Sequence, residues 1–460
     1  MPAFTIQKIP FTIESGKKEV PERMEHAQRK TGFDQGSLTG HYFHLALPVV
    51  LGSIVTIVYN LADTYFIAQT GNAALVAGVS VCAPLFTILM AFGNIFGQGG
   101  TSLISRLIGQ DRPGEVRRVS AFCFWIALAV GAGIGLFLYS IRDPFLLLLG
   151  SSPDTLPYAR EYGTVLMLGA PFIVVNFIHM NLLRCEGMAG LSMCGTLIGA
   201  VANIILDPLL IPGMGAAGAA VATVIGYLCS DAFLLIIVLA KSPGLSVKPT
   251  LKTEMPFLKD ILSIGITAAI TNIASSLCMI LINQKLLAFG DDKIAAMGIV
   301  LKATMIVQML LVGFSFGGIP LFGYLSGAKK TEQIRKLLRF CLLFLSGLSL
   351  VMTALVFLAS DPLLRFITPD EGLIATGVPM LRWQVAGSLF AGIVMLATCL
   401  SQASGKALSA LILSLSRQGV VFVIVLLAAS AVFGYQGILA SQFSADVLSA
   451  VLAVVILSKR

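Results

Sequence analysis

Charged residues are scarce in this chain, and their scarcity excludes an ordinary water-soluble protein. Asp, Glu, Lys and Arg together make up 12% of the 460 residues, whereas roughly a quarter is typical of soluble domains. Hydrophobic residues make up 57%, and the mean hydropathy is +0.90. Apolar stretches recur along the whole sequence, each close to the roughly 20 residues that a helix needs to cross a bilayer. The composition therefore indicates an integral membrane protein.

The residues that build metal sites and nucleophilic centres are also few. The chain has four histidines, and its eight cysteines stand singly, without a CxxC pair or a cluster with histidine. The sequence therefore predicts neither a disulfide nor a cysteine–histidine metal site. Since an enzyme would need such a constellation, we expect no catalytic residue and no cofactor beyond a coupling ion.

The basic residues are distributed unevenly along the chain. Residues 1–40 contain no apolar run and are predicted to be a polar tail rather than a signal peptide. Lys and Arg gather in both termini and in alternate loops, such as 241–259 and 326–339. This positive-inside pattern predicts that both termini lie in the cytoplasm, at a bacterial-type inner (plasma) membrane. It also accounts for the net charge of +8 without a nucleic-acid partner.

Hydropathy predicts an all-α integral membrane protein with twelve transmembrane helices. Each apolar stretch is long enough to span the bilayer, and the connecting stretches are short and polar. The predicted spans are 43–68, 74–104, 117–140, 160–183, 190–211, 216–240, 258–288, 294–325, 337–359, 373–400, 407–432 and 435–457.

The two halves of the chain match each other, which indicates an internal duplication. The corresponding segments are Phe96–Gly100 and Phe314–Gly318, Asp143-Pro144 and Asp361-Pro362, Glu186-Gly187 and Ser404-Gly405, and Gly215 and Gly434. Because each half has an even number of helices, both halves enter the membrane from the same side and form a parallel repeat. We expect two pseudo-symmetric six-helix bundles, divided as a tail at 1–40, an N-lobe at 41–241, a linker at 242–257 and a C-lobe at 258–460.

Carboxylates deep in the membrane are expected only in the first half. Asp63 lies in the first span, and Asp207 lies in the fifth, one turn after Asn203. A charged side chain at the bilayer centre costs about 2.5–3.5 kcal/mol, so such acids usually serve a function. The equivalent second-half positions are apolar: Leu281, Val421 and Val425.

Polar neighbours of these acids are expected at the same depth, roughly 8–10 Å below the outer surface from the helical rise. Tyr59 lies one turn before Asp63, and Thr223 lies in the sixth span. The set suits a proton shared between two carboxylates, and its oxygens equally suit Na⁺, with no other metal implied. Two other interpretations remain: Asp207 would also fit a position at the membrane interface, and Thr223 would also fit helix packing.

Other polar residues within the spans are candidates for lining a transport cavity. They are Tyr59 in the first span, Asn176 and Asn181 in the fourth, and Lys302 and Arg417 in the second half. In a central cavity, Lys302 and Arg417 would favour anionic or lipid-linked substrates. The alternative for both is a structural role, in which they pair with backbone carbonyls.

Pro48 is the candidate for a helix kink. It precedes Asp63 in the first span and removes one backbone hydrogen bond there. A bend that responds to the charge on Asp63 would couple ion binding to the shape of the cavity.

Several short motifs occur in a characteristic order over roughly residues 40–457. They are Leu47-Pro48, Tyr59–Thr64, Ile104–Gly109, Leu183–Gly187, Asn203–Pro208, Gly215–Thr223 and Ser416–Gln418. Together they resemble the multidrug and toxic compound extrusion (MATE) family, in its DinF-like and MepA-like branch. The resemblance implies a secondary antiporter with two lobes around a V-shaped cavity, which exports amphipathic, mostly cationic drugs in exchange for H⁺ or Na⁺.

The resemblance also implies site residues. It assigns the cation site to Asp63, Asn203, Asp207 and Thr223, with Tyr59 nearby. The NorM-type branch has acids in its seventh and tenth helices, whereas residues 261–288 and 373–400 contain none here, which points to coupling in the N-lobe. The partners implied are small drugs, the coupling ion and membrane lipid, and we expect a monomer. The alternatives are a lipid-linked oligosaccharide flippase or a metabolite exporter of the same superfamily; a channel would differ in an ion flux too fast for stoichiometric exchange.

Overall fold

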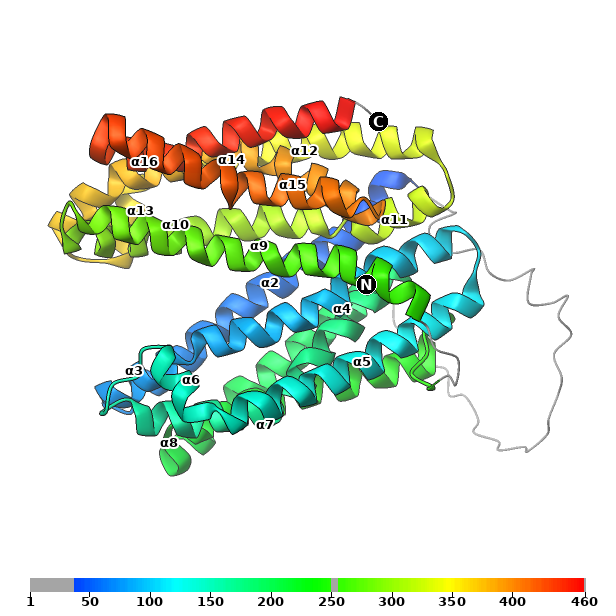
Figure 1. The fold of residues 1–460 in the computed structure, drawn as a ribbon, viewed down its shortest axis with the longest axis horizontal. Helices are drawn as coiled ribbons and strands as arrows, with labels where there is room; N and C mark the ends of the chain where they lie inside the picture. Colours follow the sequence, from blue (N-terminus) through cyan, green and yellow to red (C-terminus); the bar gives the residue numbers. More distant parts are fainter. Residues whose placement is uncertain (1–36, 250–254, 459–460) are drawn as a thin grey trace, which may run out of the picture.

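The computed structural model describes residues 37–249 and 255–458, and every regular element within them is a helix. The helices form two bundles that lie against each other (Figure 1). The N-lobe contains α2 (Leu38–Ala68), α3 (Ala73–Val81), α4 (Ala83–Gly109), α5 (Pro113–Ser140), α6 (Arg142–Leu148), α7 (Leu156–Cys185) and α8 (Ala189–Lys241). The C-lobe contains α9 (Met255–Leu287), α10 (Asp291–Phe316), α11 (Ile319–Gly327), α12 (Thr331–Leu358), α13 (Ser360–Ile367), α14 (Glu371–Ala403), α15 (Ala407–Arg417) and α16 (Val420–Ser458).

Local sequence signals determine where several helices begin. Ser37 accepts a hydrogen bond from the amide of Gly40 at the start of α2, and Asn72 and Asp370 cap α3 and α14 in the same way. Proline occupies the first turn of α4, α5, α7 and α11, where its missing N–H is not needed. Between these signals the apolar chain stays helical, because lipid offers no partner to a free backbone group.

The predicted count of twelve spans is confirmed. Ten helical segments of the described chain are long and apolar enough to cross a membrane. Two of them, Ala189–Lys241 and Ala407–Ser458, have 53 and 52 residues, and a non-helical glycine divides α8 in the first and α16 in the second. These are Gly215 and Gly434, with φ angles of 57° and 54° that a residue without Cβ adopts readily. Each break turns one long segment into two spans.

The internal repeat is visible in the backbone. Outside the two helix breaks, positive φ angles occur at Asp111 and at its equivalent Lys329, and again at Gly187 and Gly405. The two Asp-Pro pairs lie in the first turns of the short helices α6 and α13. The prediction of two pseudo-symmetric helix bundles is therefore confirmed.

The predicted tail falls largely, and the predicted linker partly, on residues that the structure does not describe. Helix α2 begins at Leu38, so the tail at 1–40 lies outside the described residues except for its last few positions. Residues 250–254 of the linker also lie outside them, and α9 begins at Met255.

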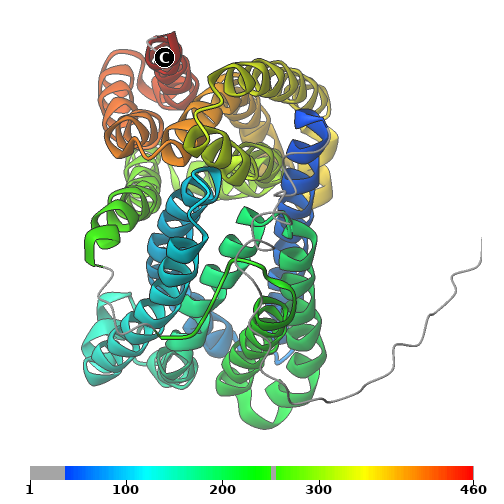
Figure 2. The same ribbon diagram turned by 90° about the vertical axis from the view of Figure 1, so that its right-hand side faces the viewer.

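Helix α2 packs in both lobes. Its first turns are buried in the C-lobe, where Tyr42 and Leu45 belong to a hydrophobic cluster and the Tyr42 hydroxyl donates to the carbonyl oxygen of Phe314 at 2.6 Å. In its last turn, Ile67 is buried in the N-lobe and packs with Leu75. Figure 2 shows α2, in dark blue, alongside the helices of the N-lobe and reaching the C-lobe. A movement of one end of α2 can therefore displace residues in the other lobe.

The backbones of the two lobes approach each other closely where α4 meets α9. A Cβ atom added at Gly265 would overlap the carbonyl oxygen of Ile95, and one added at Gly99 would overlap that of Ile261. We call this region the closed end. Toward the opposite end, which carries α3, α6 and α13, the ribbons of the two lobes diverge (Figure 1).

We predict that Gly265→Ala lowers the melting temperature of the purified protein in detergent. The added methyl group must push α9 away from Ile95, whereas the same change at Gly298, which has open space around its Cβ position, leaves the packing intact. Away from such contacts, replacing a helical glycine with alanine stabilises a helix by about 0.5–1 kcal/mol. Gly298→Ala should therefore melt at the same or a higher temperature than the unchanged protein. Equal melting of the two variants would contradict the close packing of the closed end.

Candidate cation site and central cavity

The polar residues predicted for the cation site come together inside the N-lobe. Asn203 and Asp207 lie one turn apart on α8, and the break at Gly215 reverses the chain so that Thr223 returns beside them. Nδ2 of Asn203 lies 3.5 Å from Oδ1 of Asp207 and 3.4 Å from Oγ1 of Thr223. All three side chains are buried, and Asp207 is 0% exposed.

Asp63 faces this group from α2. It interacts electrostatically with Asp207. Oδ1 of Asp63, Oδ2 of Asp207 and Oδ1 of Asn203 are all buried, and none has a hydrogen-bond partner among the described residues. Buried acceptors without partners are rare in proteins, and they are the atoms that a proton or a hard cation would engage. The donor set consists of two carboxylates, an amide and a hydroxyl, and it fits either H⁺ or Na⁺.

Two tyrosine side chains interact with Asp63, and a third interacts with one of them. Tyr59, one turn earlier on α2, interacts with Asp63 and with Tyr227 of α8. Tyr162 of α7 interacts with both Asp63 and Thr223. The sequence analysis identified Tyr59 but not the other two phenols, because nothing in the local pattern of the fourth and sixth spans reveals which side they face.

Asn176 belongs to a neighbouring polar cluster rather than to the central cavity. Its Nδ2 donates to the Ser230 hydroxyl at 2.8 Å and to Oδ1 of Asp231 at 2.9 Å. Asp231 is a further membrane acid of the N-lobe that the sequence analysis missed, although its position within an apolar span was a signal. His179, three residues after Asn176, is buried and stacks on the Phe124 ring with centroids 5.1 Å apart.

The C-lobe contains a deep carboxylate, so the expectation that deep acids occur only in the first half was wrong. Asp446 of α16 is 1% exposed, and its Oδ1 accepts a hydrogen bond from Nε of Arg417 at 2.8 Å. Gln442 donates to the same oxygen at 3.2 Å, and Arg417 also donates to Oε1 of Gln308 at 3.1 Å. Counted from the helix breaks, Asp446 is the equivalent of Tyr227, so a comparison made only at the first-half acids overlooked it.

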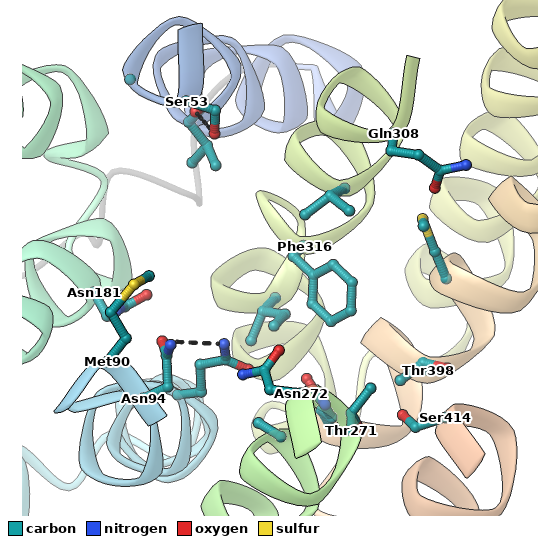
Figure 3. A pocket seen from close by; sticks show the side chains of 18 of the residues that line it. Ser53, Met90, Asn94, Asn181, Thr271, Asn272, Gln308, Phe316, Thr398 and Ser414 are labelled. Carbon is teal, nitrogen blue, oxygen red and sulfur yellow. Dashed lines mark hydrogen bonds between the residues drawn. The ribbon is translucent and has the colours of Figure 1, made fainter. Parts of the chain in front are cut away.

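A cavity of about 680 Å³ lies between the lobes. Figure 3 shows Met90, Asn94 and Asn181 along its N-lobe wall, with Asn272, Thr271 and other C-lobe side chains across from them. Of the residues predicted to line a cavity, Asn181 and Arg417 do so, and Pro48 lines it as well. Tyr59, Asn176 and Lys302 are not among the lining residues, nor are the acids of the cation site. Lys302 is exposed on α10.

The cavity wall is rich in amides and contains two charged side chains. Asparagine and glutamine contribute Asn94, Gln98, Asn181, Asn272, Gln308, Gln384, Gln402, Gln418 and Gln442. The charged side chains are Arg184 on α7 and Arg417 on α15, and no carboxylate of the described chain lines the cavity. The sequence analysis did not single out Arg184 for this role.

Comparison with known proteins agrees with this architecture. A family model described as MatE matches residues 48–209 and 267–454, which cover most of both lobes. The multidrug export protein MepA of Staphylococcus haemolyticus is 29% identical over 428 residues, which cover 92% of this chain and 94% of that protein. The protein of the same name from Staphylococcus aureus is 29% identical over 427 residues, with the same coverage.

Solved structures share the fold. A MOP superfamily transporter from Pyrococcus furiosus and an outward-facing multidrug resistance MATE family transporter of the same superfamily each superpose with a TM-score of 0.84. Each is 23% identical in sequence, and the match covers 91% of this chain and 94% of theirs. At this identity the likeness establishes the arrangement of the helices and not the ligand.

We predict that Asp446→Leu strongly destabilises the protein, because it leaves the Arg417 guanidinium buried without its partner. Breaking a buried ion pair on one side costs about 3–5 kcal/mol, whereas replacing both partners with apolar residues is often neutral. The double variant Arg417→Met/Asp446→Leu should therefore recover most of the lost melting temperature in the same detergent. A double variant that melts as low as the single one would show that the two side chains act independently.

Proposed function

The chain belongs to the MatE family of MATE transporters, and from this premise we propose that it is a secondary antiporter that exports amphipathic compounds in exchange for H⁺ or Na⁺. The observation that carries the proposal is the cluster of Asp207, Asn203 and Thr223 buried in the N-lobe, together with the half-buried Asp63, which interacts with Asp207. Its buried carboxylate oxygens without partners supply a place for one cation. Multidrug export is the activity for which the relatives are named, and we extend it to this chain as part of the proposal.

The ion and the exported compound are proposed to occupy different sites. Asp63 and Asp207 do not line the central cavity, so direct competition for one carboxylate is not the simplest coupling scheme. Helix α2 offers a physical connection, because it carries Asp63 in the N-lobe, lines the cavity at Pro48 and is anchored in the C-lobe at Tyr42. Pro48 removes one backbone hydrogen bond, which makes bending easier at that point.

In the proposed cycle, cation binding at Asp63 and Asp207 neutralises their mutual repulsion and lets α2 change its path. The cavity then changes shape and releases its compound on the side where the lobes diverge. Reopening the other side requires separation of α4 and α9 at the closed end. The positive-inside pattern of the loops supports placing the closed end and both termini in the cytoplasm, in a bacterial-type inner membrane.

A flippase for lipid-linked oligosaccharides or an exporter of metabolites is the second candidate. The observation that favours it is the charge of the cavity wall, which carries Arg184 and Arg417 and no carboxylate of the described chain. The expected preference for mostly cationic drugs rested on the N-lobe carboxylates, and these lie apart from the cavity.

We predict that Asp63→Asn abolishes ethidium transport in everted membrane vesicles energised by an imposed ion gradient. The amide keeps the size of the carboxyl group but cannot take up H⁺ or balance the charge of Na⁺. The matched control is Asp143→Asn, which changes an exposed acid paired with Arg160 and should leave transport unchanged at equal expression.

The gradient that drives ethidium uptake identifies the coupling ion. Uptake under a proton gradient, lost in Asp63→Asn, assigns H⁺, and uptake under a Na⁺ gradient assigns Na⁺. Transport that persists in Asp63→Asn removes the N-lobe carboxylate from the coupling mechanism. Transport that is absent from the unchanged protein with every gradient argues against a drug antiporter and favours the second candidate.

A further inference from the structure

The charges on the wall of the central cavity are not balanced. Arg184 and Arg417 are its charged residues, and they come from opposite lobes. Arg417 is neutralised locally, because its guanidinium forms an ion pair with Asp446 and a hydrogen bond with Gln308. Among the described residues of the wall, Arg184 therefore determines the net charge.

Arg184 has no anionic partner in the described structure. Its one hydrogen bond to another side chain runs from Nη1 to Oδ1 of Asn181, a neutral acceptor, at 3.4 Å. Nε of Arg184 is buried and has no hydrogen-bond partner. Its position in the last turn of α7 places the guanidinium favourably in the helix dipole, but the dipole does not satisfy the Nε donor. Arg184 is half-buried, and leaving its buried Nε donor without a partner is costly, so an anionic ligand would remove that cost.

Amide groups stand beside this arginine. A Cβ atom added at Gly97 would lie 3.0 Å from Nδ2 of Asn181, so Asn181 packs against the turn of α4 that carries Asn94 and Gln98. Oδ1 of Asn94 accepts a hydrogen bond from Gln98 at 3.3 Å, which leaves the Asn94 N–H groups to donate to a ligand. Figure 3 shows Asn94 and Asn181 on the same wall of the cavity.

We propose that Arg184, with the neighbouring amides Asn94 and Asn181, binds the carboxylate group of an amphipathic substrate in the central cavity. The planar guanidinium matches a carboxylate in two parallel hydrogen bonds, and the apolar part of the substrate would lie against Met90, Phe177 and Phe316 of the same cavity. The substrate class is thus amphipathic carboxylates, including zwitterions that also carry a cationic group. The inference rests on the proposed function in one respect: it takes the cavity between the lobes to be the substrate cavity.

A matched pair of dyes tests this recognition. A rhodamine with a free carboxylate and the methyl ester of the same dye differ in the group that Arg184 would bind. Each is titrated against the purified full-length protein in lipid nanodiscs and followed by fluorescence anisotropy. The unchanged protein should bind the carboxylate dye about tenfold more tightly than the ester, the change expected from one charge-assisted pair of hydrogen bonds.

Variants of the site separate charge recognition from packing. Arg184→Gln keeps a hydrogen-bond donor but removes the charge, so it should weaken the carboxylate dye about tenfold and leave the ester within about twofold. Arg184→Lys should retain part of the preference. Arg335→Gln changes an exposed arginine of α12 outside the cavity and should bind both dyes as the unchanged protein does.

Asn181→Asp provides an independent test that leaves Arg184 in place. The new carboxylate would replace the amide oxygen that lies 3.4 Å from the guanidinium and would form an internal ion pair with it. It would also lose the hydrogen bond that Nδ2 of Asn181 donates to the carbonyl oxygen of Phe177 at 2.7 Å, which affects both dyes alike. Binding of the carboxylate dye should then fall relative to binding of the ester. This test still applies if Arg184→Gln fails to fold.

The proposal is overturned if the unchanged protein binds the ester as tightly as the carboxylate dye. It is equally overturned if Arg184→Gln or Asn181→Asp weakens both dyes to the same extent, which would indicate a packing role. Because the titrations use no ion gradient, they are independent of coupling. Selective carboxylate binding without gradient-driven transport of either ethidium or the carboxylate dye would sustain this site and count against the antiporter. Gradient-driven transport without selective carboxylate binding would do the reverse.

Discussion

The arrangement of the two lobes depends on helix α2, which packs in both of them. Helix α2 begins inside the C-lobe, where the Tyr42 hydroxyl bonds to the carbonyl oxygen of Phe314, and ends inside the N-lobe at Ile67. Because a bilayer offers no partner to a free backbone group, α2 cannot unravel between these anchors, and it can only tilt or bend. The position of one lobe relative to the other is thus connected mechanically to the environment of Asp63, near the far end of the same helix.

The two lobes differ in how the charges of their membrane-embedded side chains are neutralised. In the C-lobe, Arg417 and Asp446 neutralise each other, and two glutamines complete their hydrogen bonds. Such a pair has a fixed charge and contributes rigidity. In the N-lobe, Asp63 and Asp207 lie near each other without a basic partner in the described structure, and their free oxygens are buried. Binding of a proton or cation would stabilise that arrangement, so we propose that its occupancy varies. The two lobes of the duplicated fold therefore differ: the C-lobe contains a neutralised ion pair, whereas the N-lobe contains carboxylates that a ligand could neutralise.

Much of the fold was predictable because its signals are local. Twelve spans follow from hydropathy, and the breaks at Gly215 and Gly434 occur at equivalent glycines of the repeat. The grouping of Asn203, Asp207 and Thr223 follows partly from helical spacing. The pairing of Arg417 with Asp446 could not be obtained this way, because it depends on how α15 packs against α16. Lys302 was predicted to line the cavity from its position within a span, but it does not. Which side of a helix faces the cavity also depends on packing that the sequence does not reveal.

The separation of the carboxylates from the cavity would constrain the proposed exchange of ion and substrate. If ion and substrate shared one carboxylate, an acidic cavity wall would be needed, and the wall of the described structure is amide-rich with an unbalanced arginine. A substrate carboxylate at Arg184 and a cation at Asp63 would not compete for one group. Each would instead favour a different position of α2 and of the α4–α9 contact. Coupling of this kind is a difference in the affinity of each ligand for two arrangements of the lobes, and it acts equally in both directions. Antiport then requires that the cation favour the arrangement that holds the substrate more weakly.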